Sequence, residues 1–214
     1  MSPESAKCLG SGLSKTSSLG SFTINRCGIT PFLMYGIAEG IAESQFITHL
    51  DFSYNGIEDE AALILLQAIL KNNEKKDDKT WKKSLRKRKM SLAEMQSSSS
   101  LKLPRKDIKG ITVLNLKSNF IGLSFMRQFS KSIQFDMYIR VVNLSDNLLD
   151  TSCTHLLLDA VNSNCTLVNF DITNNACYTD KLKSRIAIKL LKNYRDNMNE
   201  GYKNEQMYIS RQQL

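Results

Sequence analysis

The residues best suited to catalysis or metal binding are few and scattered. The chain has 214 residues with two histidines and five cysteines, and no two cysteines form a C-x-x-C pair. A zinc site needs about four such ligands at short spacing, so none is expected. The motifs G-x-x-x-x-G-K-S/T, G-x-S-x-G and H-E-x-x-H do not occur in the sequence. The sequence therefore predicts a protein that is not an enzyme and needs no cofactor or small-molecule substrate.

One histidine and one carboxylate could still act as a pair. His49 and Asp51 are two residues apart in an alternating apolar–polar stretch, which is typical of a half-buried strand. Residues at that offset point to the same face of a strand. No serine or cysteine nucleophile accompanies them, so the pair is interpreted as an ion pair or as contact residues for a partner.

The elements that position these residues are internal repeats. A pattern of the form L-x-x-L-x-L-x-x-N-x-L begins at Leu19, Ile47, Ile111, Ile139 and Leu167. Successive copies start 28 residues apart, except where 36 extra residues separate the second from the third. This pattern and this period are typical of leucine-rich repeats.

Each slot of the repeat has an expected role. Slots four and six should point into the core, and the slots between them should face outward. Phe22, Leu50, Leu114, Val142 and Phe170 share slot four, and Ile24, Phe52, Leu116, Leu144 and Ile172 share slot six. Slot nine holds Asn55, Asn119, Asn147 and Asn175, with Cys27 in the first copy. These amides are expected to be structural, because a short polar side chain can satisfy backbone groups where the chain leaves the strand.

The second half of each copy has helical spacing. Four copies carry apolar pairs at i and i+4, namely Ile37 and Ile41, Leu65 and Ile69, Phe129 and Ile133, and Leu157 and Val161. In the last copy the apolar set is expected at Ile186, Leu190 and Leu191, one residue late. A short strand and a long helix per 28 residues predict an α/β fold, a right-handed ribonuclease-inhibitor-like solenoid. Parallel strands should form its concave face and helices its convex face.

The repeat register divides the chain into segments. We expect part of a preceding repeat and a tail at 1–18, two repeats at 19–74, an insert at 75–110, three repeats at 111–194 and a tail at 195–214. Leu9 and Leu13 fall at the slots of Ile37 and Ile41, so the chain is expected to begin inside a repeat. Phe22, Ile24 and Ile37 should then lack neighbours on that side. The tail at 195–214 is expected to be a frayed helix or disordered.

Targeting features are not expected. No apolar run of about 18 residues is present, so insertion in a membrane is not predicted. The first 18 residues have neither a basic start nor an apolar segment of a secretory signal. Cys27 and Cys177 fall in core slots, where a small buried thiol is ordinary, and we infer a reducing compartment.

The insert carries the positive charge of the chain. It has 13 lysines and arginines against 4 acidic residues, a net charge of +9, so the rest of the +8 chain has a net charge of −1. The stretch from Asp77 to Met90 is expected to be helical, and Ser97–Ser100 and Pro104 to be flexible. A solvated loop, a docking element for an acidic protein surface, and a nucleic-acid, import or membrane element are the open interpretations. The residues of interest are Trp81, Arg86, Lys87, Arg88 and Lys89, with Ser91 a possible phosphorylation site because Arg88 precedes it by three.

The insert motif points to a family. Thr80-Trp81, Ser84-Leu85-Arg86 and Arg88, placed between two repeats, resemble the seventy-eight-kilodalton centrosomal protein family. Lys89-Met90-Ser91-Leu92 departs from the proline-containing continuation expected there. The resemblance implies a non-enzymatic protein of the centriole or basal body, within the cytoskeleton of the cytoplasm. It also implies a role in centrosome and cilium assembly and contact with centriolar proteins and ubiquitin-ligase components.

Outward slots should supply a binding surface. The candidates are Arg26, His49, Asp51, Tyr54, Asn115, Lys117, Asn143, Asp146 and Asp171. Their mixed charge suits a protein partner better than nucleic acid. An alternative is an axonemal or actin-associated scaffold, of the dynein regulatory complex or tropomodulin type, which also uses such repeats. The insert motif favours the centriolar interpretation.

Overall fold

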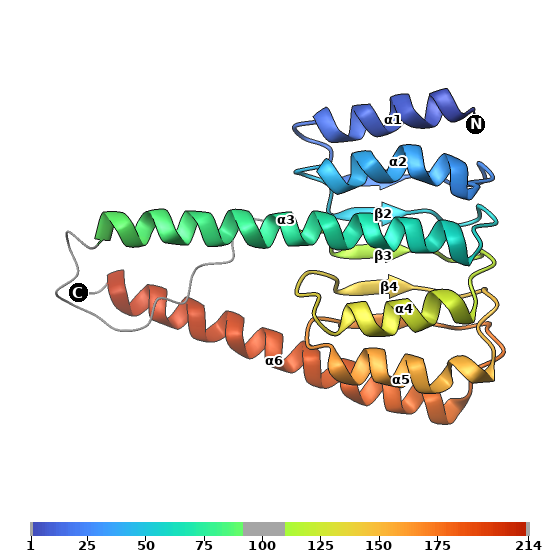
Figure 1. The fold of residues 1–214 in the computed structure, drawn as a ribbon. Helices are drawn as coiled ribbons and strands as arrows, with labels where there is room; N and C mark the ends of the chain where they lie inside the picture. The colour runs from blue at the N-terminus through green and yellow to red at the C-terminus, as the bar shows by residue number, and fades with distance from the viewer. Residues whose placement is uncertain (1, 92–109, 213–214) are drawn as a thin grey trace.

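The computed structural model shows a row of short parallel strands backed by helices. It describes the backbone of residues 2–91 and 110–212, and the side chains of residues 2–77 and 110–198. Strands and helices alternate along the chain (Figure 1). The elements are α1 (Pro3–Lys15), β1 (Ser21–Thr23), α2 (Pro31–Glu43), β2 (His49–Asp51), α3 (Asp59–Ser91), β3 (Val113–Asn115), α4 (Leu123–Ile133), β4 (Val141–Asn143), the 3-10 turn η2 (Thr151–Cys153), α5 (Thr154–Ser163), β5 (Asn169–Asp171) and α6 (Asp180–Gln212).

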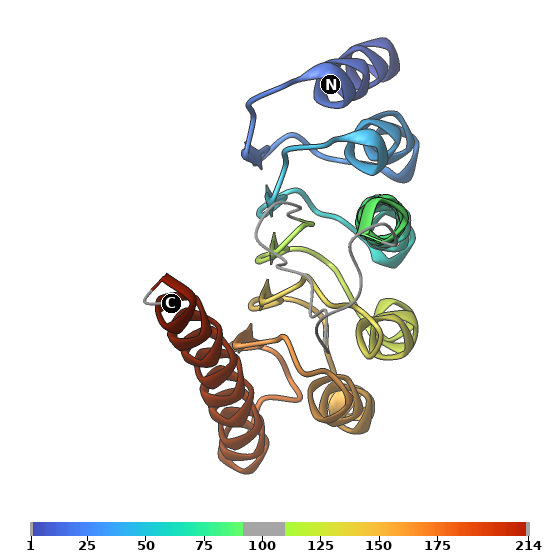
Figure 2. The same ribbon diagram turned by 90° about the vertical axis from the view of Figure 1, so that its left-hand side faces the viewer.

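The sheet follows the repeat register. Its strand order is β1-β2-β3-β4-β5, and every pair is parallel. Leu50 is paired with Leu114, and Leu114 with Val142, so the 36 inserted residues leave the register intact. Viewed down the strands, the strands form the inner layer of an arc and helices α1 to α5 the outer layer (Figure 2). The predicted fold class is confirmed.

The core consists of the slots that the repeat assigned to it. Leu50, Leu114 and Val142 in slot four are buried, as are Phe52, Leu116 and Leu144 in slot six. The helix pairs Ile37 and Ile41, Leu65 and Ile69, Phe129 and Ile133, and Leu157 and Val161 are buried against them. Each repeat therefore buries its apolar faces against its neighbours rather than around one centre, as solenoids do.

The two ends of the core differ in part from expectation. In the last copy Ile186 is buried and Leu190 is partly buried against the core, as expected, but Leu191 is 56% exposed and Leu182 is buried instead. At the other end, Phe22 is only partly buried. Ile37 is nevertheless completely buried and Ile24 is 9% exposed, and α1 packs on α2 there.

The contact between α1 and α2 depends on glycine. A β-carbon at Gly10 would lie 2.0 Å from the carbonyl oxygen of Gly36, and one at Gly40 would lie 2.0 Å from that of Gly10. The two helices thus touch through their backbones, which only glycine permits. Both helices also begin in the same way: Pro3 and Pro31 occupy the first turn, and Ser2 and Thr30 cap it.

The long helices pass the predicted repeat boundaries without a break. The boundary expected at Glu74 lies inside α3, which continues to Ser91, and the boundary near Tyr194 lies inside α6. Lys75 forms an ion pair with Glu43, and the Lys76 ammonium donates to the carbonyl oxygen of Gln45 at 2.7 Å. The first two lysines of the predicted insert thus contact the repeat before it.

Candidate protein-binding surface

The candidate surface begins where each strand ends. Asp51, Asn115, Asn143 and Asp171 are the last residues of β2 to β5 and share one register position. Each side-chain oxygen accepts the backbone N–H two residues later, at 2.9 to 3.1 Å. This local bond turns the chain out of the strand. These four predicted site residues therefore have a structural role, although they remain partly exposed.

The next outward position requires unusual backbone geometry. Arg26, Tyr54, Ser118, Asp146 and Asn174 have φ angles between 54° and 59°. They are the same slot of five successive repeats. Non-glycine residues rarely adopt this left-handed conformation. We call these five residues, together with the neighbouring Lys117 and Phe120, the strand-end row. It contains four of the predicted site residues, namely Arg26, Tyr54, Lys117 and Asp146.

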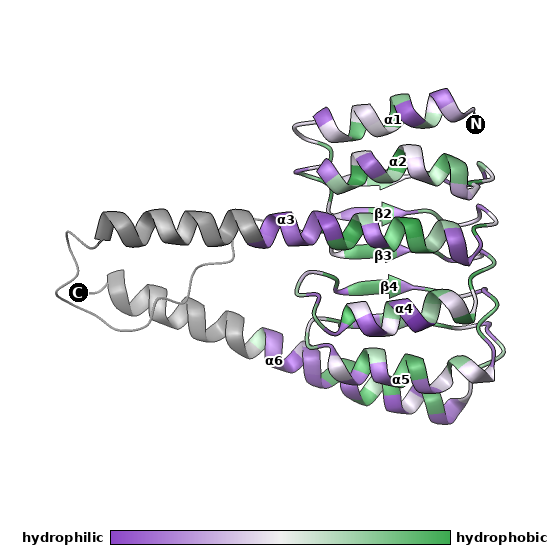
Figure 3. Cartoon of the chain, in the orientation of Figure 1, coloured by the Kyte–Doolittle hydropathy of each residue, from purple (hydrophilic) through white to green (hydrophobic). Residues whose placement is uncertain are grey.

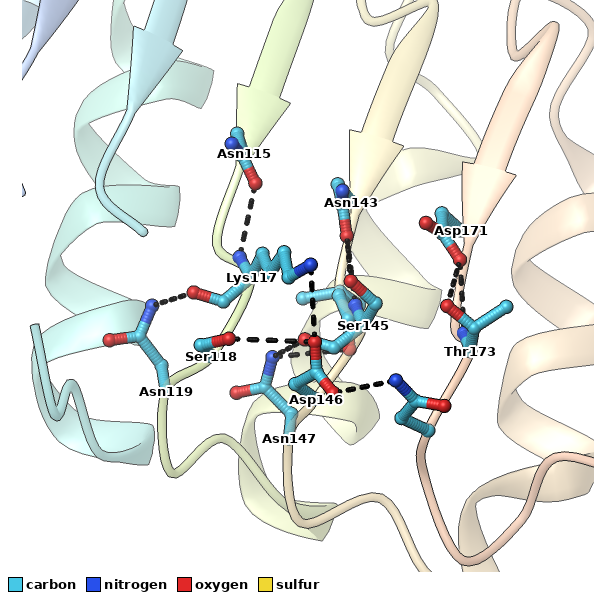
Figure 4. A network of polar contacts seen from close by, with 12 residues as sticks. Asn115, Lys117, Ser118, Asn119, Asn143, Ser145, Asp146, Asn147, Asp171 and Thr173 are labelled. Carbon is cyan, nitrogen blue, oxygen red and sulfur yellow. Dashed lines mark hydrogen bonds and ion pairs between the residues drawn. The ribbon is translucent and has the colours of Figure 1, made fainter. Parts of the chain in front are cut away.

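Charged groups of the strand-end row are paired across repeats. The Lys117 ammonium lies 3.4 Å from Asp146, whose carboxylate accepts from the Asn174 amide at 2.8 Å and lies 3.5 Å from the Ser118 hydroxyl (Figure 4). The hydrogen bond from Asn174, followed by those from Lys117 and Ser118, lowers the pKa of Asp146. The hydrogen bond to Asp146 raises the pKa of Lys117. The charged groups of Lys117 and Asp146 are therefore paired across neighbouring repeats.

The N-terminal half of the row has a different character. The guanidinium of Arg26 lies 5.5 Å from the centre of the Tyr54 ring, within the range of a cation–π contact. Tyr54 is 43% exposed. The ring of Phe120, 57% exposed, lies near Gly56, whose β-carbon would be 3.5 Å from it. Two exposed aromatic rings, one of them beside a cation, are groups that protein partners commonly contact.

The repeat asparagines lie directly behind this row and are structural, as predicted. Asn55, Asn119, Asn147 and Asn175 are buried, and each side-chain nitrogen donates to three backbone carbonyls. Their oxygens accept backbone N–H groups of the preceding repeat. They hold the turns that display the strand-end row.

A second polar ladder joins the other ends of the repeats and was missed by sequence reasoning. Asn72, Asn164 and Asn193 are buried, and each donates to two backbone carbonyls. All of these carbonyls belong to the preceding repeat, except that of Leu167, which opens the repeat of Asn193. Asp136 accepts from the backbone of Tyr138 and Ile139. A signal existed, since Ser44, Asn72, Asp136 and Asn164 share one slot of the 28-residue period once the insertion is removed.

The structure brings no catalytic or metal centre together among the residues it describes. The Nδ1 of His49 is hydrogen-bonded to the Thr48 hydroxyl at 2.7 Å, whereas the carboxylate of Asp51 accepts from the Ser53 hydroxyl. Each of the two residues is therefore bonded to its own neighbour in the chain. No group of three or more metal-ligating side chains occurs in the described part of the chain. Burial raises the pKa of the Cys153 thiol to about 11, which keeps this thiol protonated at neutral pH.

The predicted insert residues are described only in their backbone. Helix α3 includes Trp81, Arg86, Lys87, Arg88, Lys89 and Ser91, and their side chains lie outside the described residues. The helices that the structure describes include none long and apolar enough to cross a membrane. The insert therefore remains a sequence-based candidate beside the strand-end row.

The strand register, the asparagine ladder and the outer helices define a leucine-rich-repeat solenoid. The tropomodulin C-terminal domain of Caenorhabditis elegans has this fold, with a TM-score of 0.62 at 14% identity over 94% of this chain and 99% of that one. A structure described as leiomodin-1 actin-binding site 2 has a TM-score of 0.66 at 10% identity over 96% of this chain and 95% of that one. At these identities the likeness shows the fold alone.

The sequence itself is similar to curated centrosomal proteins from two mammals. Centrosomal protein of 78 kDa from Mus musculus is 25% identical over 86% of this chain, and its Homo sapiens counterpart is 26% identical over 90%. The resemblance predicted from the insert motif is thus confirmed as a distant relationship. The aligned region covers 22% and 26% of those proteins, so the chain spans about a quarter of the length of the curated relatives it matches. No family model matches the chain.

Proposed function

We propose that this protein is a non-enzymatic scaffold of the centriole or basal body that acts in centrosome and cilium assembly. The observation that carries the proposal is the sequence similarity to centrosomal protein of 78 kDa, which extends over 86% to 90% of the chain. A similarity of this extent includes the repeats on both sides of the insertion. The centrosomal location is named for the relatives and is extended to this chain as a proposal.

The strand-end row is the proposed partner-binding surface. It combines exposed aromatic groups at Tyr54 and Phe120 with the paired charges of Lys117 and Asp146. Solenoids bind partners along such extended inner surfaces. A mixed pattern of charges favours a protein partner of complementary pattern over the uniformly negative backbone of a nucleic acid.

The basic insert is a second proposed contact. Its net charge of +9 against −1 for the rest of the chain concentrates attraction for an acidic surface in one segment. Centriolar proteins and ubiquitin-ligase components are the proposed partners. Binding through the insert should weaken as salt is raised, because exposed charges are screened over about 10 Å at 0.1 M ionic strength.

The test is the location of the tagged protein in ciliated cells, together with co-sedimentation with filamentous actin. The proposal expects a signal at centrioles or basal bodies and no protein in the actin pellet. A signal along actin filaments or the axoneme, with co-sedimentation, would replace it with the actin-associated alternative. A diffuse signal at native expression would refute both.

A further inference from the structure

The first described part of α6 has two faces of opposite character. Leu182, Ile186 and Asn193 are buried against the end of the solenoid. On the opposite face Ile188, Leu191 and Met198 are 70%, 56% and 57% exposed. Their spacing of three and seven residues aligns them along one side of the helix. Hydrophobic and hydrophilic residues are interspersed along this part of α6 (Figure 3).

Basic residues share this outer face. Lys181, Arg185, Lys192 and Arg195 are exposed and are spaced by four, seven and three residues, which keeps them on one side of the helix. None of them forms an ion pair with a residue that the structure describes. Residues 180–198 contain six basic and two acidic residues, Asp180 and Asp196. We define the outer α6 face as Lys181, Arg185, Ile188, Leu191, Lys192, Arg195 and Met198.

The charge of this face restricts what can bind it. A second copy would place the same cations opposite one another, and like charges across an interface are unfavourable. Nucleic acid would use the cations but not three large apolar side chains, because its affinity comes mainly from phosphate contacts. A lipid surface needs a larger apolar area than a line of three side chains about 15 Å long. The remaining class is an amphipathic helix with complementary charge.

We propose that the outer α6 face binds an acidic amphipathic helix of a partner protein. The apolar residues of that helix pack on Ile188, Leu191 and Met198, in the manner of a helix laid along a hydrophobic strip. Its carboxylates lie beside Lys181, Arg185 and Lys192, as flanking charges do in paired helices. The proposal goes beyond the strand-end row and the basic insert and depends on neither.

The test uses two synthetic helices of three heptads with leucine at a and d. One carries glutamate at e and g and the other lysine, and binding is measured by fluorescence anisotropy with the whole chain. The acidic helix should bind at least about tenfold more tightly than its lysine twin, because the complementary charges favour association and like charges oppose it. Backbone NMR shifts should map its contact to residues 181–198.

Two variants locate the binding face. Ile188→Ser with Leu191→Ser should weaken binding at least about tenfold, because two exposed apolar contacts are lost. Both residues face solvent, so the melting temperature should not change. Phe32→Ser with Tyr35→Ser, which removes exposed apolar groups from α2, is the matched control and should bind as the parent does.

Three results would overturn the proposal. They are equal affinity for the acidic and lysine helices, unchanged affinity of the Ile188→Ser, Leu191→Ser variant, and absence of peptide binding. In a last experiment, binding of the chain to vesicles of phosphatidylcholine and phosphatidylserine is measured. If the chain binds these vesicles through Leu191 and does not bind the acidic helix, the face recognises lipid instead. If the acidic helix does not bind, the localisation test of the proposed function can still succeed, because it depends on different residues.

Discussion

The side-chain oxygen of Asn73 accepts the backbone N–H of Ile111 at 3.0 Å, and this bond joins the two ends of the insertion. The side-chain nitrogen of Asn73 also donates to Asp136 at 2.6 Å. In an uninterrupted repeat, the backbone N–H at the start of the next copy is bound by the residue in the slot of Asn72, one position before Asn73. Asn164 occupies that slot, for example, and its side-chain oxygen accepts the N–H groups of Thr166 and Leu167. The corresponding oxygen of Asn72 has no hydrogen-bond partner among the described residues, because the chain continues as α3 instead of turning. Asn73 thus replaces Asn72 where the repeat resumes.

Replacing Asn73 should therefore destabilise the solenoid. Asn73→Ala leaves the buried N–H of Ile111 and one oxygen of Asp136 without partners, at a cost of about 1–3 kcal/mol. Urea unfolding measures this loss, with the exposed neighbour change Glu74→Ala as the control. Equal unfolding midpoints for the two variants would show that the hydrogen bonds of Asn73 do not stabilise the solenoid at the insertion.

The inner and outer slots should differ sharply in stability. Leu144→Ala removes a fully buried side chain and should lower the free energy of unfolding by about 2–5 kcal/mol. Lys117→Ala removes a partly exposed cation from a surface ion pair and should cost less than about 1 kcal/mol. Chemical denaturation of both variants checks the register, which would be wrong if Lys117→Ala cost as much as Leu144→Ala.

The fixed period made most of the fold predictable from the sequence. Slots four, six and nine meet the same surroundings in every copy, so residues such as Leu116 and Asn147 could be assigned without coordinates. The backbone contact at Gly10, Gly36 and Gly40 occurs once and leaves no periodic signal. The last helix departs from the period by one residue, as Asn193 shows by occupying the slot that follows Asn164. With that shift Leu182, Ile186 and Asn193 fall at the buried slots of Cys153, Leu157 and Asn164, whereas Leu191 falls at the slot of the exposed Asn162 and lies at the surface.

The candidate site was less predictable, because repeat position does not report local pairing. Arg26, Tyr54 and Asp146 could be assigned to outward slots, but their left-handed backbone and the bond from Asn174 to Asp146 required coordinates. Asp51 and Asn143 shared the outward assignment, yet their side chains are bonded to their own turns.

Asp146 should titrate below the ordinary aspartate value of about 3.9. Its pKa is lowered first by Asn174 and then by Lys117 and Ser118. A lowered folded pKa means that its contribution to stability is present above the unfolded value and is lost as pH falls through the folded pKa. Carboxyl NMR titration should show the Asp146 pKa rising in Asn174→Ala and in Lys117→Ala. An unchanged pKa in Asn174→Ala would contradict the network.

The basic insert is expected to act as a charge-controlled contact. Ser91→Glu adds negative charge beside Arg88 and Lys89, and replacing Arg86, Lys87, Arg88 and Lys89 with alanine removes four charges. Both variants should show reduced centriolar signal at equal expression, with unchanged melting of the solenoid. If both variants localise normally, the insert is a solvated segment that makes no contact with a partner.

The most direct test of the account compares two matched double variants at centrioles in cells. Tyr54→Ala with Lys117→Glu changes the strand-end row, whereas Tyr35→Ala with Arg127→Glu makes the same types of change on the exposed surfaces of α2 and α4. Centriolar fluorescence per cell is measured at equal expression and equal melting temperature. The account predicts loss of centriolar signal for the strand-end variant and parental signal for the helix variant. Equal signal for the two variants, or loss only in the helix variant, would contradict it.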